Sequence, residues 1–273
     1  MAVCIKLGAE GLTDEFVVFL RSILGLPVIL VLFLIWPREC FYIRKPKAHI
    51  IRGTLIFIAV FMFIYTITRL PVANSVVIQH MAPLFMPFFA LLLIGEKITL
   101  RHIILLILGF FAVLIINDPS MESFISYVVL IGIASACISS FTSVYSKQIM
   151  DNDHPCALTL SFTACLIFFS SLWVLLTGGW QIPSLETCLY VMLAATFANL
   201  AHLWSFLALK EVNSSYFAML VCMSIPFGVI GGVVFLDEYP NILSLAGIVF
   251  LLGLIIVSSI LEMKSNKNIS SNK

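Results

Sequence analysis

The sequence predicts an all-α protein that crosses a membrane many times, and three observations support this fold class. Of its 273 residues, 61% are hydrophobic and only 11% are charged, whereas a soluble domain carries about 25% charged residues. Its mean hydropathy of +1.12 leaves too little polar surface to cover one large soluble core. The apolar residues also gather in runs of about 20 residues, the length of an α-helix that crosses roughly 30 Å of hydrocarbon. These properties exclude a soluble enzyme, a nucleic-acid-binding protein and a disordered chain.

Nine such apolar runs follow one another, and short polar joints separate them. Their polarity does not alternate, as it would in the strands of an outer-membrane barrel. The runs cover residues 14–36, 48–69, 72–94, 99–117, 124–147, 155–177, 186–209, 213–236 and 241–262. A tenth apolar fragment, from Met1 to Ala9, rises only roughly 14 Å as a helix and is too short to span the bilayer. This fragment is either a truncated helix or the product of a wrongly assigned start codon.

The placement of lysine and arginine predicts the orientation of these helices. Twelve of the fifteen basic residues lie on alternate joints or in the C-terminal tail, and Arg69 alone lies on the opposite side. The remaining two, Lys6 and Arg21, fall inside apolar segments. Because loops rich in Lys and Arg stay on the cytoplasmic side, we expect a cytoplasmic (inner) membrane protein with its C-terminus in the cytoplasm and the 118–123 joint outside. The seven cysteines form no CxxC and no metal-ligand spacing, so we expect no metal and no cofactor.

An internal repeat divides the chain into two halves. An offset of 142 residues places segment 69–98 over segment 211–240 and aligns Glu96 with Glu238. The two copies lie five spans apart, and because five is odd they would cross the membrane in opposite directions. Inverted repeats of this kind are typical of secondary transporters. The expected segments are a first repeat at 1–117, a second repeat at 124–262 and a cytoplasmic polar tail at 263–273.

Several motifs, taken in order along the chain, resemble the EamA-type drug/metabolite transporters. In the first half they are Arg-Ser at 21–22, Arg-Gly at 52–53, TRLPVANSVVIQHMAPLF at 68–85 and LLLIGEKITLRH at 91–102. In the second half they are FLALKEVNSSYFAML at 206–220 and FLDEYPNILSLAGIVFLLGLIIV at 235–257. The resemblance implies ten helices in two inverted five-helix repeats around a cavity that opens alternately to each side. It also implies a lipid bilayer and a small-molecule substrate as partners, since family members carry amino acids, nucleotide-like metabolites, S-adenosylmethionine or toxic organic compounds.

The chain departs from the family in its first helix, of which Met1 to Gly8 resembles only the second half. We expect either that the natural chain begins about ten to fifteen residues upstream, since a full span needs about 20 residues, or that this version is transport-defective. A transport-defective remnant or a non-transporting membrane scaffold is therefore the alternative to a working carrier.

Polar side chains inside apolar runs are the candidates for a substrate-binding site, because burying them in hydrocarbon costs free energy. The candidates are Lys6, Tyr65, Gln79, His80, Ser143, Asn199, His202, Trp204 and Tyr216. Some of them have a structural alternative: Lys6 could extend toward the membrane surface, and Ser143 could serve helix packing. Arg21 is expected to have a structural role and to pair with Asp14 or Glu15.

Gln79 and His80 lie near the middle of the 72–94 run and precede two prolines, Pro83 and Pro87. Proline lacks a backbone N–H and leaves the carbonyl one turn earlier without its helical donor. We therefore expect carbonyl groups near Gln79 and Pro83 to face a wet cavity. For His80, the alternative is a histidine satisfied within the core.

Asn199 and His202 are three residues apart and share a helix face, with Trp204 close by. His80 and His202 come from different repeats, and a reference pKa of about 6.5 would allow them to carry a proton at physiological pH. Proton coupling is therefore one hypothesis. Tyr65 and Arg69 are four apart, which places a phenol and a cation on one face.

The expected function is secondary-active transport of a small organic metabolite by alternating access. The sequence contains no GxxxxGK[ST] motif for ATP, so a gradient must supply the energy. An intramembrane enzyme is disfavoured, since the five histidines at positions 49, 80, 102, 154 and 202 form no cluster in the sequence. The substrate, the direction of transport, the coupling ion and the oligomeric state stay open.

Overall fold

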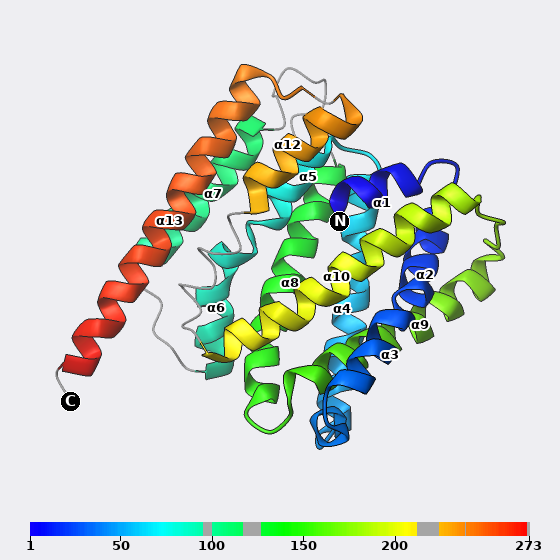
Figure 1. Cartoon of the computed structure of the whole chain (residues 1–273). Coiled ribbons are helices and arrows are strands. Elements are labelled where there is room, and N and C mark those ends of the chain that lie inside the picture. The colour runs from blue at the N-terminus through cyan, green and yellow to red at the C-terminus, as the bar shows by residue number, and fades with distance from the viewer. Residues whose placement is uncertain (95–99, 117–126, 212–223, 238, 272–273) are drawn as a thin grey trace. The chain divides into compact units, whose positions relative to one another are not determined.

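The structure, a computed structural model, describes residues 1–94, 100–116, 127–211, 224–237 and 239–271. Every regular element in these ranges is a helix, which confirms the all-α class (Figure 1). The helices are α1 (Ala2–Gly8), α2 (Asp14–Leu24), α3 (Leu26–Ile35), η1 (Arg38–Phe41), α4 (Pro46–Ile67), α5 (Val72–Gln79), α6 (Ala82–Ile94), α7 (Leu100–Ile116), α8 (Tyr127–Met150), α9 (Pro155–Thr177), α10 (Leu185–Glu211), α12 (Ser224–Leu236) and α13 (Ile242–Ser271). The segment expected as a polar tail begins inside α13, whose helix continues to Ser271.

Five of the described segments are long and apolar enough to cross a membrane. They are Asp14–Ile35, Pro46–Ile67, Tyr127–Met150, Pro155–Thr177 and Leu185–Lys210, each of 22 to 26 residues. Shorter apolar helices cover Val72–Met86, Phe227–Leu236 and Ile242–Leu254. The chain is thus a multi-pass helical membrane protein, while the full number of ten spans stays a prediction.

The chain divides into two compact units, and each unit takes segments from both halves of the sequence. Unit 1 contains residues 1–69 and 145–210, and unit 2 contains residues 70–144 and 211–273. The long helix α8 runs across the border between them. The expected repeats follow the order of the sequence, whereas these units follow the contacts among helices.

In unit 1, α9 is the central helix, because both α2 and α4 pack along it. A group of apolar side chains joins α2 to α9 and α10, and a second group joins α3 and η1 to the same two helices. The first is Phe16, Phe19, Leu20, Val174 and Val191, and the second is Ile29, Leu32, Phe41, Cys156 and Leu203. Rings also stack across α4 and α9, where the centroids of Phe57 and Phe169 lie 5.6 Å apart.

The first long apolar run, predicted as one segment, is divided into α2 and α3 at Gly25. Pro27 stands near the start of α3 and has no N–H to donate to the carbonyl of Ile23, one turn earlier. A Cβ added to Gly25 would lie 2.6 Å from Nδ2 of Asn199. Glycine is therefore required here, because it lets the Asn199 amide approach the backbone of this break.

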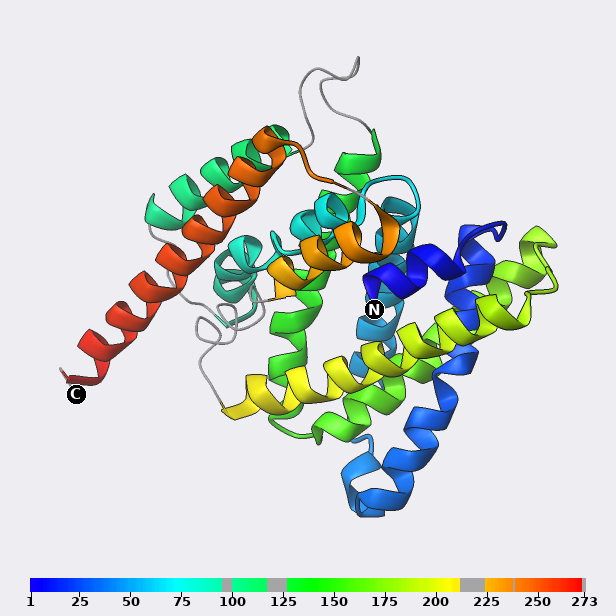
Figure 2. The same cartoon turned by 45° about the horizontal axis from the view of Figure 1, so that its top comes forward.

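In unit 2, α7 and α13 lie side by side, as both views show (Figures 1 and 2). Helix α12 packs on α5, and Gly228 meets the side chain of Val76 there. Side chains from α5, α6, α7, α8 and α13, with Met81 between α5 and α6, form one buried apolar core. Its members are Val77, Ile78, Met81, Leu84, Ala112, Val129, Ala136, Ile248 and Leu251.

The 72–94 run is also not one continuous helix, because it breaks at His80 between α5 and α6. The backbone N–H of His80 bonds to the carbonyls of Val76 and Val77, and that of Met81 bonds to Ile78 at 3.1 Å. These short-range bonds tighten the end of α5. Pro83 cannot donate to the carbonyl of Gln79, so the break falls where the sequence predicts a freed carbonyl.

Candidate functional site

A small cavity lies inside unit 1, between the middle parts of three helices. Its walls come from α2, α9 and α10, and its lining residues are Arg21, Ser22, Thr163, Leu166, Ala195 and Asn199. Its volume is about 10 Å³, which is about the size that one water-sized group occupies. Because α2, α9 and α10 belong to apolar spans, this is a polar pocket within membrane-spanning helices.

Arg21 is the charged wall of this cavity. It is 4% exposed, and its Nε has no hydrogen-bond partner. The sequence predicts that Arg21 pairs with Asp14 or Glu15, and this is wrong for Asp14, whose carboxylate instead accepts from Arg69 Nη1 at 2.6 Å. Within the described part of the chain, no carboxylate forms an ion pair with Arg21. A buried guanidinium without an anion is costly, so this position calls for an explanation.

Asn199 is the candidate that the structure brings into this cavity. It is buried, and its Nδ2 donates to the carbonyl oxygen of Gly25 at 3.0 Å. An amide NH₂ group has two donors, so the second remains available to the cavity. The bend at Gly25 and the polar group of α10 are thus joined by one buried hydrogen bond.

His202 and Trp204 lie one turn further along α10, and neither lines the cavity. The ring of His202 packs on Phe162 at 4.4 Å and on Phe206 at 6.1 Å. It lies within electrostatic reach of Arg21 and Arg52. Trp204 is 66% exposed and points away from the buried groups of α10.

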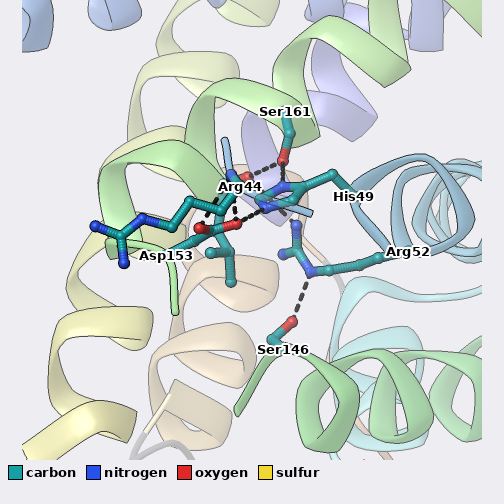
Figure 3. Close-up of polar contacts among 7 residues, drawn as sticks. Arg44, His49, Arg52, Ser146, Asp153 and Ser161 are labelled. Atoms are coloured by element: carbon teal, nitrogen blue, oxygen red, sulfur yellow. Dashed lines mark hydrogen bonds and ion pairs between the residues drawn. The ribbon is translucent and has the colours of Figure 1, made fainter. Parts of the chain in front are cut away.

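Arg52 is a second buried guanidinium in unit 1. The distribution of basic residues predicted that it would lie in a cytoplasmic joint, and this is wrong. It lies inside α4 and is 0% exposed. Its Nε donates to Ser146 Oγ at 2.6 Å and its Nη1 to the Leu158 carbonyl at 3.3 Å (Figure 3). Its Cζ also lies 4.8 Å from the ring centroid of Phe206, a cation–π contact. These contacts hold Arg52 between α4, α8, α9 and α10.

Next to Arg52, His49 joins a carboxylate and a hydroxyl. Its Nε2 lies 2.9 Å from Asp153 Oδ2 and its Nδ1 lies 2.6 Å from Ser161 Oγ (Figure 3). Asp153 also accepts from the backbone N–H of Arg44 at 3.1 Å. Sequence reasoning missed this cluster and treated the histidines as scattered. All three side chains are buried and connect α4 to α9 and the turn before it.

The hydroxyl of Ser161 has two acceptors within reach, which gives the cluster two arrangements of its protons. Ser161 Oγ lies 3.0 Å from the Leu158 carbonyl as well as near His49. Either the hydroxyl donates to a neutral His49, or it donates to Leu158 and accepts from a doubly protonated ring. The cluster thus joins α4 and α9 through buried hydrogen bonds and lines no described cavity.

At the other end of α4, Tyr65 and Arg69 form the pair that their spacing predicts. Arg69 Cζ lies 3.6 Å from the centroid of the Tyr65 ring. Thr68 and Arg69 both bond to Asp14, which joins the end of α4 to the start of α2. Lys6 is half-buried on α1, which packs against α4.

In unit 2, the Gln79 amide is engaged in helix packing. Its Nε2 donates to Ser139 Oγ at 2.9 Å, and its Oε1 accepts from Ser135 Oγ at 3.1 Å. His80 Nδ1 lies 2.7 Å from the Val76 carbonyl. Ser143 donates to the Ser139 carbonyl one turn earlier at 2.8 Å.

The candidate Tyr216 lies outside the described residues, as do Glu96 and Glu238, on which the repeat was aligned. Of the remaining candidates, Asn199 lines the cavity described above. The residues that sequence reasoning missed are Arg21 as a cavity wall and the His49–Arg52 region. The available signal was a charged residue within an apolar run, which both arginines show.

The described spans and the polar groups buried among them define a multi-pass helical membrane protein with an intramembrane polar site. The chain belongs to the EamA-like transporter family, whose model matches residues 1–118 and again residues 126–260. The resemblance of the sequence to this family is thereby confirmed.

Characterised and uncharacterised transporters are among its relatives. The chain is 24% identical over 272 residues to the pseudopaline exporter CntI of Pseudomonas aeruginosa, strain UCBPP-PA14, covering 98% of this chain and 92% of that protein. It is 25% identical over 279 residues to an uncharacterized transporter of Helicobacter pylori, strain 26695, covering 99% and 86%. A crystal structure of another protein matches with a TM-score of 0.70 at 17% identity, covering 96% of this chain and 95% of that one. This last likeness concerns the fold alone.

Proposed function

We propose that the protein is a secondary-active transporter that moves a small organic metabolite across the cytoplasmic membrane by alternating access. The observation that carries this proposal is the polar cavity with Arg21 and Asn199 inside membrane-spanning helices. Polar and ionisable groups are costly in a membrane interior and are placed there for substrate or ion pathways. Membership of the EamA-like family supports the same function.

The proposal includes ten spans in two inverted repeats, the C-terminus in the cytoplasm, and export as the direction. Export is supported by the name of the Pseudomonas relative, and the orientation by the asymmetry of basic residues. The substrate is a small amphiphilic metabolite such as an amino acid or an S-adenosylmethionine-like compound.

Proton coupling is the proposed source of energy. His80 and His202 are the first candidates from their positions within apolar runs. The His49–Asp153 pair adds a third candidate, because a buried imidazole and a buried carboxylate are joined there by a hydrogen bond. A protonophore should then collapse transport, and an imposed pH gradient should drive it.

The test is a metabolite screen in everted vesicles from cells that produce the full chain, compared with vesicles that lack it. Replacing Gln79, His80, Asn199 and His202 singly by apolar residues of similar size should lower transport without lowering the amount in the membrane. Full activity in all four variants would show that these side chains do not form the pathway. No accumulation of any metabolite under any gradient would refute a carrier and leave a scaffold.

A further inference from the structure

The interior of unit 1 contains two guanidinium groups, and each has one nitrogen without a hydrogen-bond partner in the described structure, Nε of Arg21 and Nη2 of Arg52. Arg52 donates hydrogen bonds from Nε and Nη1 and lies over the Phe206 ring. Arg21 has neither an ion pair nor a donor bond from Nε in the described structure. Since a buried charge is normally paired or neutralised, an anion is the group that the surroundings of Arg21 call for.

Two acids of unit 1 form ion pairs with other residues in the described structure. Asp14 pairs with Arg69, and Asp153 pairs with His49. Asp153 additionally accepts from the Arg44 backbone. Drawing either carboxylate to Arg21 would break these contacts, so neither of them is the compensating anion.

The donors that face the cavity suit a carboxylate. Arg21 can offer Nε–H, and Asn199 can offer its second amide hydrogen, since the first goes to Gly25. The hydroxyls of Ser22 and Thr163 donate to carbonyls of their own helices, at 2.6 and 3.2 Å. A guanidinium beside an amide NH₂ group therefore supplies two donors to one acceptor group, and charge-assisted bonds of this kind are about twice as strong as neutral ones.

We propose that the Arg21–Asn199 cavity binds one oxygen of a carboxylate group of the transported metabolite. This inference rests on the proposed transport function. A volume of about 10 Å³ accommodates about one oxygen atom, so one carboxylate oxygen enters the cavity and the remainder of the metabolite stays outside it. Neutral analogues, such as primary amides of the same shape, are rejected because they leave the guanidinium without an anion.

The site can be tested with the smallest suitable probe, acetate, on the purified full chain in lipid nanodiscs. The thermal midpoint is followed by tryptophan fluorescence while acetate replaces sulfate at constant ionic strength. Acetamide is the neutral analogue, and chloride is the arm that detects a simple halide site. Acetate should raise the midpoint saturably, by about 3–6 °C at ten times its dissociation constant, and acetamide should not.

Arg21→Gln should abolish the acetate response, whereas the matched control Arg38→Gln, at an exposed position of η1, should retain it. If the glutamine variant does not fold, Arg21→Lys replaces it. Lysine keeps the charge and loses the planar donor fork, which should weaken acetate binding about tenfold or more. An unchanged acetate response in both Arg21 variants overturns the proposal. An equal response to chloride also overturns it, because the site would then be specific for charge alone.

Failure of this inference and failure of the proposed function give different results. If vesicles transport a metabolite but acetate has no effect that depends on Arg21, the carboxylate site is wrong and transport stands. If acetate binds through Arg21 but no metabolite is moved, the carboxylate site stands and transport is wrong. If both hold, amidating the carboxylate of the transported metabolite should reduce its transport at least tenfold.

Discussion

Replacing Asp153 by alanine should destabilise unit 1 strongly. The Asp153 carboxylate accepts from His49 Nε2 at 2.9 Å and from the Arg44 N–H at 3.1 Å. A hydrogen bond to a charged group contributes about 1.5–3 kcal/mol, so two such bonds give an upper limit of about 6 kcal/mol. The net contribution is smaller, because burying the carboxylate also costs its desolvation. We therefore expect a loss of about 3 kcal/mol, which is more than a hundredfold in the unfolding equilibrium.

The assay is equilibrium unfolding of the purified protein in mixed micelles, titrated with SDS and followed by tryptophan fluorescence. Asp151→Ala is the matched control, because Asp151 lies two residues earlier and is exposed. Asp153→Asn should fall between wild type and Asp153→Ala, since an amide oxygen can still accept from Arg44. A double-mutant cycle with His49→Leu should give a coupling energy of about 1–3 kcal/mol. If Asp153→Ala is as stable as Asp151→Ala, the buried cluster contributes nothing and the reasoning is wrong.

Three other perturbations test the packing, a helix cap and the orientation. Gly53→Ala should cost about 1–3 kcal/mol, because a Cβ there would clash with the Cys165 side chain; adding Cys165→Gly should restore the thermal midpoint. Burial, followed by the positive charge of Lys210, lowers the pKa of His154. The stability that His154 contributes to the folded protein is therefore complete above pH 6.5 and is lost as the pH falls below that value. His154→Asn keeps a capping side chain, and its melting temperature should not show this loss below pH 6.5. In intact cells, an impermeant thiol reagent should leave a single-cysteine variant that retains Cys40 unlabelled, and strong labelling would reverse the orientation.

Apolar runs gave good predictions of the spans because hydropathy is a local property. The runs at 155–177 and 186–209 match α9 and α10 within one or two residues. The break between α5 and α6 falls beside Pro83, where the sequence predicts a freed carbonyl, although the sequence did not predict a complete break. A proline removes a hydrogen bond whatever surrounds it, so its effect can be read from the sequence.

Polar pairing was harder to predict, because the partners lie far apart along the chain. His49 and Asp153 are separated by 104 positions, and Arg52 and Ser146 by 94. Nothing in the local pattern specifies which helices meet, so Arg52 resembled one more basic residue of a cytoplasmic joint. Asn199 was correctly chosen as a polar group within a span, but its acceptor, the Gly25 carbonyl, could be identified only from the fold.

The interleaved composition of unit 1 constrains how the protein is made. A ribosome adds about 5–20 residues per second, so α4 emerges roughly 5–20 seconds before Ser146, Asp153 and Leu158, the partners of Arg52 and His49. During this interval Arg52 has to remain near the lipid headgroups or in the insertion machinery, because it would have no hydrogen-bond partner in hydrocarbon. We therefore expect helix α4 to enter the bilayer fully only after α8 and α9 have been synthesised. A nascent chain released before residue 145 would present an unneutralised cation to the membrane, so we expect such fragments to be degraded by membrane proteases.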